Sequence, residues 1–141
     1  METTTVRHFK RPVEHPFTKA QKATTKIIFG GLTPFHERLI QGAMESQGYQ
    51  MAPMPTPDVE AFQTGKEFGN YGQCNPTYFT SGNLVKYLQN LEKSGLTRQE
   101  IVDGYVFFSA GACGPCRFGM YEAEYRHSLK SSGFDGFRVI L

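Results

Sequence analysis

Three cysteines are the residues of this chain with the clearest capacity for chemistry. Cys74 follows a glycine-rich stretch and precedes Asn75-Pro76, whereas Cys113 and Cys116 form a Cys-Gly-Pro-Cys motif in a second glycine-rich segment. Both segments lead into stretches where proline and the spacing of apolar residues predict a helix. Thiols at helix N-termini ionise readily, because the unpaired N–H groups and the helix dipole favour a negative charge. The sequence therefore predicts a site made of thiolates.

Three kinds of site fit this cysteine pattern. The first is a [4Fe–4S] cluster on Cys74, Cys113 and Cys116, with one iron left open to another ligand or a substrate. The second is a thioredoxin-like dithiol on Cys113 and Cys116, although too few residues follow for the hairpin that completes such a site. The third is zinc, held by the three cysteines and either His36 or His127. Three buried, unreactive cysteines are the structural alternative.

The thiols need elements to position them, and the apolar pattern before Cys74 predicts a βαβ unit. Residues 27–29 are a short apolar run that ends at two glycines, and residues 49–52 are a second run closed by prolines. Between them, Thr33-Pro34 and apolar residues at helical spacing predict a helix that ends near Gly48. Strand, helix and strand within about thirty residues predict a parallel sheet.

The second half of the chain continues this alternation. Residues 58–74 are glycine-rich and are expected to be mostly loop. The elements predicted after them are a helix from Asn75 or Ser81 to Gly95, a short helix with a Thr97/Glu100 capping box, a central strand at 105–108, a helix at 118–129 and a last strand at 137–141. Glu122 and Glu124 are expected on the solvated face of the helix at 118–129. The predicted fold is α/β, a small and mostly parallel three-layer sheet with helices on its faces, like an incomplete Rossmann-like domain.

Length, composition and charge set the domain organisation. The chain has 141 residues, a formal net charge of +2 and 39% hydrophobic residues, which suits one globular domain. Residues 1–25 are predicted to form a flexible basic leader or linker, and residues 26–141 the α/β domain. Because the chain stops in an apolar strand, we expect this domain to be truncated at its C-terminus.

The same features exclude some partners. The basic residues near the N-terminus are spread out and lack interleaved aromatic residues, so no nucleic acid is expected as a partner. No apolar run approaches the ~20 residues of a membrane span, and the N-terminus lacks the apolar core of a secretory signal. We therefore expect a cytoplasmic protein that does not enter a membrane.

Three segments carry a resemblance to a known family: residues 57–67, 73–88 and 110–121. The last two include Gln73-Cys74-Asn75-Pro76-Thr77-Tyr78-Phe79 and Ala110-Gly111-Ala112-Cys113-Gly114-Pro115-Cys116. They resemble the large activator-type proteins of the 2-hydroxyacyl-CoA dehydratase system, in which an ATP-hydrolysing activase is fused to dehydratase-like iron–sulfur modules. The resemblance implies that Cys74, Cys113 and Cys116 bind a [4Fe–4S] cluster, or a larger double-cubane cluster as in related proteins.

The resemblance also implies a function and partners. An activase would pass one low-potential electron to the cluster protein, which reduces an acyl-CoA-type substrate. The chain lacks the Gly-x-x-x-x-Gly-Lys-Ser/Thr motif of a phosphate-binding loop, so ATP is expected only on a partner or on a missing domain. The expected partners are the activase ATPase domain or subunit and the remaining dehydratase-like region, without which the chain is not expected to be active. Near the cluster, Asn75 and Thr77 are expected to donate hydrogen bonds to sulfur.

Overall fold

A four-stranded parallel sheet forms the centre of the computed structural model, which describes residues 14–31, 33–111 and 116–141. The strands are β1 (Lys26–Phe29), β2 (Gln50–Pro53), β3 (Tyr105–Phe108) and β4 (Arg138–Ile140), and their order in the sheet is β2-β1-β3-β4. All three neighbouring pairs are parallel. The predicted βαβ unit and parallel sheet are thus confirmed, and the apolar strand β3 lies inside the sheet as expected.

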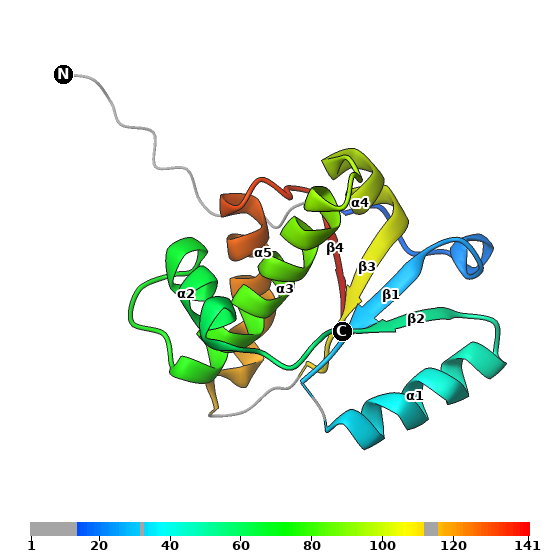
Figure 1. The fold of residues 1–141 in the computed structure, drawn as a ribbon, viewed down its shortest axis with the longest axis horizontal. Coiled ribbons are helices and arrows are strands. Elements are labelled where there is room, and N and C mark those ends of the chain that lie inside the picture. Colours follow the sequence, from blue (N-terminus) through cyan, green and yellow to red (C-terminus); the bar gives the residue numbers. More distant parts are fainter. Residues whose placement is uncertain (1–13, 32, 112–115) are drawn as a thin grey trace.

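Helices connect the strands in the described part of the chain (Figure 1). The α-helices are α1 (Pro34–Ser46), α2 (Val59–Phe68), α3 (Asn75–Lys93), α4 (Arg98–Gly104) and α5 (Tyr121–Ser131), and two short 3-10 helices are η1 (Lys19–Gln21) and η2 (Arg117–Met120). None of the helices in the described residues has the length and apolar character of a membrane span. The architecture is that of a small Rossmann-like α/β domain.

The two faces of the sheet bury different cores. On one face, Ile28, Phe107 and Val139 pack with apolar residues of α3, α4 and α5. On the other face, Ile27 and Val106 belong to a smaller core that includes residues of α1 and of the segment before η1. The side chains of a strand alternate between its faces, so neighbouring residues of β1 enter different cores. Helices therefore cover both faces, and the three-layer arrangement is confirmed (Figure 1).

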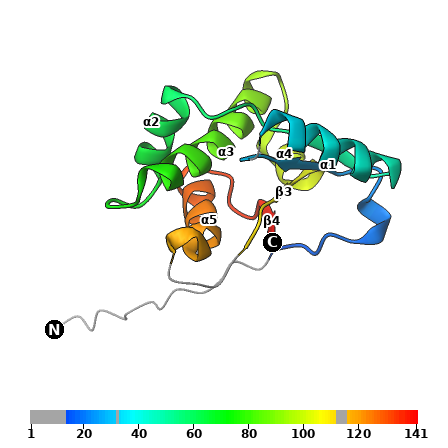
Figure 2. The same cartoon turned by 90° about the horizontal axis from the view of Figure 1, so that it is seen from below.

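The segment from residue 58 to residue 74 differs from the expectation of a loop. It contains α2, a ten-residue helix whose first N–H groups are capped by Asp58, because the carboxylate accepts from the N–H of Ala61 at 2.8 Å. Its glycine at 65 is a packing residue rather than a helix stop: a Cβ there would overlap the main-chain carbonyl of Tyr78 on α3. The close contact between α2 and α3 thus depends on glycine. The same glycines give this helical segment a composition that is typical of a loop. Figures 1 and 2 both show these two helices side by side.

The order of the strands identifies the edge of the sheet at which a ligand site is expected. From β1 the chain passes first to β2 on one side and then to β3 on the other, so the direction of winding reverses between β1 and β3. In parallel α/β sheets, ligands bind beyond the carboxyl ends of the strands at such a reversal. Residues 109–111 leave the carboxyl end of β3 at this point. The Cys-Gly-Pro-Cys motif therefore follows the strand that borders the reversal.

Residues 14–25, expected as part of a leader, make specific contacts with the domain. Glu14 forms an ion pair with Arg126 of α5 at 2.6 Å, and Phe17 packs against the smaller core. Figure 2 shows this segment, in blue, passing beside the strands. The start of the described chain is thus tied to α5 and to β4.

Candidate functional site

Cys74 stands at the N-cap of α3. Its Sγ lies 3.0 Å from Oγ1 of Thr77 and 3.6 Å from the hydroxyl oxygen of Tyr121 on α5. Thr77 thus lies within hydrogen-bonding distance of this sulfur, whereas none of the hydrogen bonds in the described part of the chain joins Asn75 to it. The contact with Tyr121 is new, and it joins the start of α3 to the start of α5, 47 residues further along the chain.

These contacts favour the thiolate form of Cys74. The side-chain hydrogen bond with Thr77 lowers the pKa of this thiol most, and the hydrogen bond with Tyr121 and the N–H of Thr77 lower it further. Burial raises the pKa of Tyr121, so this phenol keeps its proton and remains able to donate. A sulfur that accepts from hydroxyl and N–H groups is stabilised as an anion.

The loop before Cys74 is fixed by partly buried hydrogen bonds. Glu124 of α5 accepts from the main-chain N–H of Asn70 at 2.7 Å and from its side-chain amide at 2.8 Å. The hydroxyl of Tyr78 donates to the carbonyl of Asn70 and accepts from the N–H of Gln73, both at 3.0 Å. Glu124 is only 5% exposed, so the expectation of a solvated position for this residue is wrong. Its carboxylate instead ties the Cys74 loop to the helix that follows Cys116.

Cys116 lies on the other side of this junction. It is the N-cap of η2, its thiol is exposed, and it makes no side-chain cap bond. The chain continues directly from η2 into α5, whose first residue, Tyr121, contacts the Cys74 sulfur. The fold therefore brings Cys74 to the short segment that begins with Cys116. Cys113 lies outside the described residues.

The two cysteine segments enter this arrangement by different routes. α3 follows the helix α2, whereas η2 and α5 follow the strand β3. Cys74 nevertheless reaches the carboxyl edge of the sheet because α3 packs against α5. The N-terminus of α5 lies at that edge, since the helix must run back to the amino end of β4.

Neither of the two candidate histidine ligands, His36 and His127, bonds to the sulfur of Cys74. Nδ1 of His36 lies 2.7 Å from Oγ1 of Thr33, where both belong to the exposed start of α1. His127 is exposed on α5. Within residues 14–31, 33–111 and 116–141, no three His, Cys, Asp or Glu side chains form a metal-binding group.

Sequence reasoning missed the residues that build the junction around Cys74: Asn70, Tyr78, Tyr121 and Glu124. Tyr121 and Glu124 reach this junction from α5, which packs against α3, whereas Tyr78 bonds to the loop just before its own helix. The only available signal was the position of Tyr121, five residues after Cys116 at the start of a predicted helix. No protein-family model, curated protein or solved structure matches this chain. The chemistry of the thiol site therefore carries the functional argument.

Proposed function

We propose that Cys74, Cys113 and Cys116 bind an iron–sulfur cluster of the [4Fe–4S] type and that the chain is a low-potential electron-transfer module. The observation that carries this proposal is the 3.6 Å contact between the Cys74 sulfur and the Tyr121 hydroxyl. It brings a cysteine from the middle of the chain to the segment that starts at Cys116. Without this contact, three cysteines spread over 43 positions would have no common site.

The described donors fit a thiolate-bound cluster. The pKa of the Cys74 thiol is lowered, and hydroxyl groups of Thr77 and Tyr121 lie at its sulfur, as hydrogen bonds to cluster sulfurs require. Cys116 is exposed and is not used as a helix cap, so its thiol is available to a ligand. Such a cluster would supply one-electron transfer at low potential, and three thiolates would leave one iron open to substrate or to a further ligand.

We further propose that the chain works within a 2-hydroxyacyl-CoA dehydratase or activase-type system, with an acyl-CoA-type substrate. Two of the segments that carry the resemblance, 73–88 and 110–121, form or flank the thiol junction. The third segment includes Gln63–Glu67, which lies inside α2, whereas a phosphate-binding loop precedes its helix. This placement agrees with ATP hydrolysis on an activase domain or partner subunit rather than on this chain.

Anaerobic reconstitution tests the cluster. We expect protein treated with iron and sulfide to become brown, to contain both elements in near-equal amounts and to bleach with dithionite. The variants C74S, C113S and C116S should each lose iron, because every one removes a ligand, whereas H127S on the exposed face of α5 should retain it. Colourless protein without bound iron, or iron retained in C74S, would contradict the proposal.

The same variants separate the cluster from the two other cysteine sites. A dithiol oxidoreductase would reduce insulin disulfides, lose this activity in C113S and keep it in C74S. A zinc site would bind one colourless zinc ion with loss in all three cysteine variants and no stable iron. After Cys116 the described chain forms η2, α5 and one parallel strand, with no hairpin of the kind that completes a thioredoxin-like site.

A further inference from the structure

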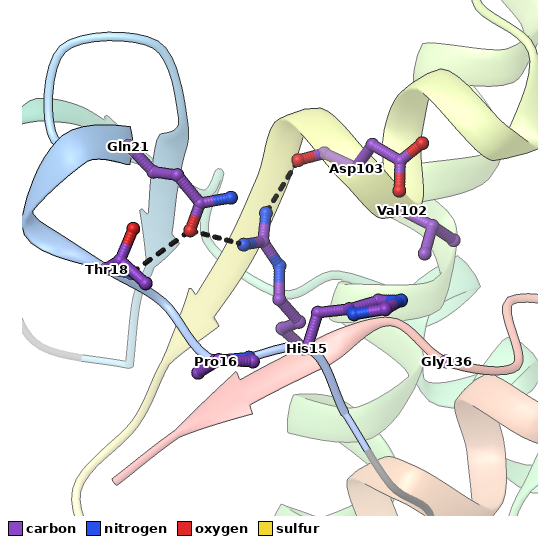
Figure 3. A pocket seen from close by; sticks show the side chains of 8 residues that line it. His15, Pro16, Thr18, Gln21, Val102, Asp103 and Gly136 are labelled. Atoms are coloured by element: carbon purple, nitrogen blue, oxygen red, sulfur yellow. Dashed lines mark hydrogen bonds between the residues drawn. The ribbon is translucent and has the colours of Figure 1, made fainter.

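A pocket of about 490 Å³ lies at the amino ends of the strands, at the opposite edge of the sheet from Cys74. It is bordered by the segment before β1, by the end of α4 and by the first residue of β4, Arg138. Figure 3 shows Thr18 and Gln21 on one side of this space and Val102 and Asp103 on the other, with Pro16 and His15 below. We call it the Arg138 pocket, because this residue is the only arginine or lysine among its described lining residues.

The guanidinium of Arg138 is buried but incompletely bonded. The residue is 3% exposed. Nη2 donates to the main-chain carbonyls of Asp103 at 2.6 Å and Tyr105 at 3.2 Å, and Nη1 donates to Oε1 of Gln21 at 3.4 Å. Nε has no hydrogen-bond partner among the described residues. The bond to Gln21 is the longest of the three and the easiest to exchange for a stronger acceptor.

The charge of this guanidinium also lacks a carboxylate partner. Arginine keeps its proton in proteins, and burial lowers the pKa of Arg138 although the carboxylates of Asp103 and Glu14 act against this. No carboxylate of the described chain forms an ion pair with it. The carboxylate of Asp103 accepts from the side-chain amide of Gln99, and it points away from the guanidinium (Figure 3). The end of α4 offers only the partial charge of its carbonyls, about half a unit for a longer helix.

Arg126 is a second buried arginine of the same fold, and it differs from Arg138 in having carboxylate partners. Its side chain is 6% exposed, and it forms ion pairs with Glu14 and Glu122, each at 2.6 Å. Two buried arginines thus lie close to the same N-terminal segment, one neutralised by two carboxylates and one by none. Burying an unpaired charge is costly, so the difference calls for an anion at Arg138.

We propose that the Arg138 pocket binds the oxyanion group, carboxylate or phosphate, of a small molecule. The guanidinium offers Nη1 to the oxyanion once the Gln21 amide turns aside to make room. Thr18 and Gln21 provide further polar groups, while Pro16 and Val102 contact the apolar part of the ligand. This binding is independent of the cluster, because it uses none of the cysteines.

Nuclear magnetic resonance of the arginine side chains tests the pocket directly in the full-length chain. Inorganic phosphate and, separately, acetate are added at constant ionic strength with chloride as the reference anion. We expect the Nε–H signal of Arg138 to shift and saturate with at least one of the two, while the Nε–H signal of the paired Arg126 stays in place. Saturation with phosphate alone or with acetate alone identifies the chemical source. An Arg138 signal that moves with neither, or only in parallel with exposed Arg98, overturns the proposal.

A charged wall residue provides the second test. Thr18 is an exposed residue of the pocket wall, so T18D adds a carboxylate there without disturbing the core. We expect it to weaken anion binding by about tenfold or more, through charge repulsion and competition for Arg138. The matched control is T24D, an exposed threonine outside the pocket, which should leave the affinity within about twofold of wild type. Equal loss in both variants would show that the anion responds only to overall charge and would refute the site.

Discussion

The sulfur of Cys74 illustrates how single hydroxyl groups prepare a thiol for a ligand. Thr77 and Tyr121 approach it from two helices, and both lower its pKa. The nearer hydroxyl, at 3.0 Å, has the larger effect, and the farther one joins the site to α5. Thr77, which lowers the pKa of the thiol most, is therefore close to Cys74 in sequence. Tyr121, which joins the thiol to α5, comes from a distant part of the chain.

Replacing Thr77 by valine tests this activation. T77V keeps the shape of the side chain and removes the hydroxyl, so we expect the pKa of the Cys74 thiol to rise toward its ordinary value of 9.0. Thiolate absorbance during a pH titration measures it in cluster-free protein that lacks the other two cysteines. Y121F should raise the pKa of this thiol by less than T77V. V59T, at an exposed position of α2, should leave it unchanged. A larger effect of Y121F would contradict the assigned order of the two donors.

Residue-level prediction succeeds where a contact is local. Thr77 is three positions after Cys74 at a proline-marked helix start, so its hydrogen bond to sulfur could be predicted from spacing alone. Glu124 could not be predicted, because its partner Asn70 is 54 positions away and glutamate on a helix is usually solvated. The burial of Arg126 and Arg138 escaped prediction for the same reason. Polar residues become buried when distant elements supply their partners, and those partners are not adjacent in sequence.

At the scale of elements, the pair α2 and α3 holds the Cys74 loop in place. A Cβ at Gly82 of α3 would overlap the main-chain carbonyl of Ala61 and the nitrogen of Gly65, and one at Gly65 would overlap the carbonyl of Tyr78. The two helices therefore touch backbone to backbone. The sequence shows these glycines but not their purpose, and this is why α2 was expected to be a loop while the proline- and threonine-marked starts of α3, α1 and α4 were recognised.

The G82A variant tests the close approach of α2 and α3. We expect it to lower the free energy of unfolding by at least about 2–3 kcal/mol, because the added methyl group must push the helices apart. G42A on exposed α1 is the control: a Cβ there meets no atom within 4 Å, so alanine should stabilise the protein by up to about 1 kcal/mol. Urea unfolding measures both. A G82A protein as stable as wild type would mean that the two helices are not in backbone contact.

The start of α2 should make stability depend on pH. The hydrogen bond from Lys86 of α3, and then that from the N–H of Ala61, lower the pKa of Asp58 below its ordinary value of 3.8. The carboxylate is thus favoured by folding. Its contribution is fully present above pH 3.8 and is lost as the pH falls through the lower pKa of the folded state.

The D58N variant isolates this contribution. Asparagine keeps an oxygen for the helix cap but carries no charge to pair with Lys86. We expect wild type to be more stable than D58N at neutral pH, and the two to converge in acid, as followed by urea midpoints over a pH series. E60Q removes the more exposed second partner of the same lysine and is the control, which should lower stability at neutral pH by less than D58N. A stability difference that stays constant with pH would show that only the cap, and not the charge, matters.

At the scale of the whole molecule, the described N-terminal segment closes the open edge of the sheet. Val139 pairs with Phe107 on its inner side. On its other side, its N–H donates to Glu14 at 3.2 Å and its carbonyl accepts from Arg126 at 3.0 Å. Two side chains thus take the hydrogen bonds that a further strand would offer, which protects an edge strand from pairing with other chains. The parallel sheet, the inner place of β3 and the three layers followed from the alternating pattern of the sequence. The order of the strands did not, and this closure depends on a glutamate that was expected in a leader.

E14A should therefore affect both stability and association. The variant leaves Arg126 with Glu122 alone and frees the N–H of Val139, so we expect a loss of about 2–3 kcal/mol, somewhat below the ~3–5 kcal/mol of a fully buried pair that loses one partner. E60A breaks an exposed ion pair with Lys86 and should cost less than about 1 kcal/mol. Urea unfolding gives these energies, and sedimentation should show that E14A, unlike E60A, associates as its concentration rises, because the edge of β4 is open. An E14A protein that matches E60A in stability and remains monomeric would show that Glu14 rests on the sheet edge without protecting it.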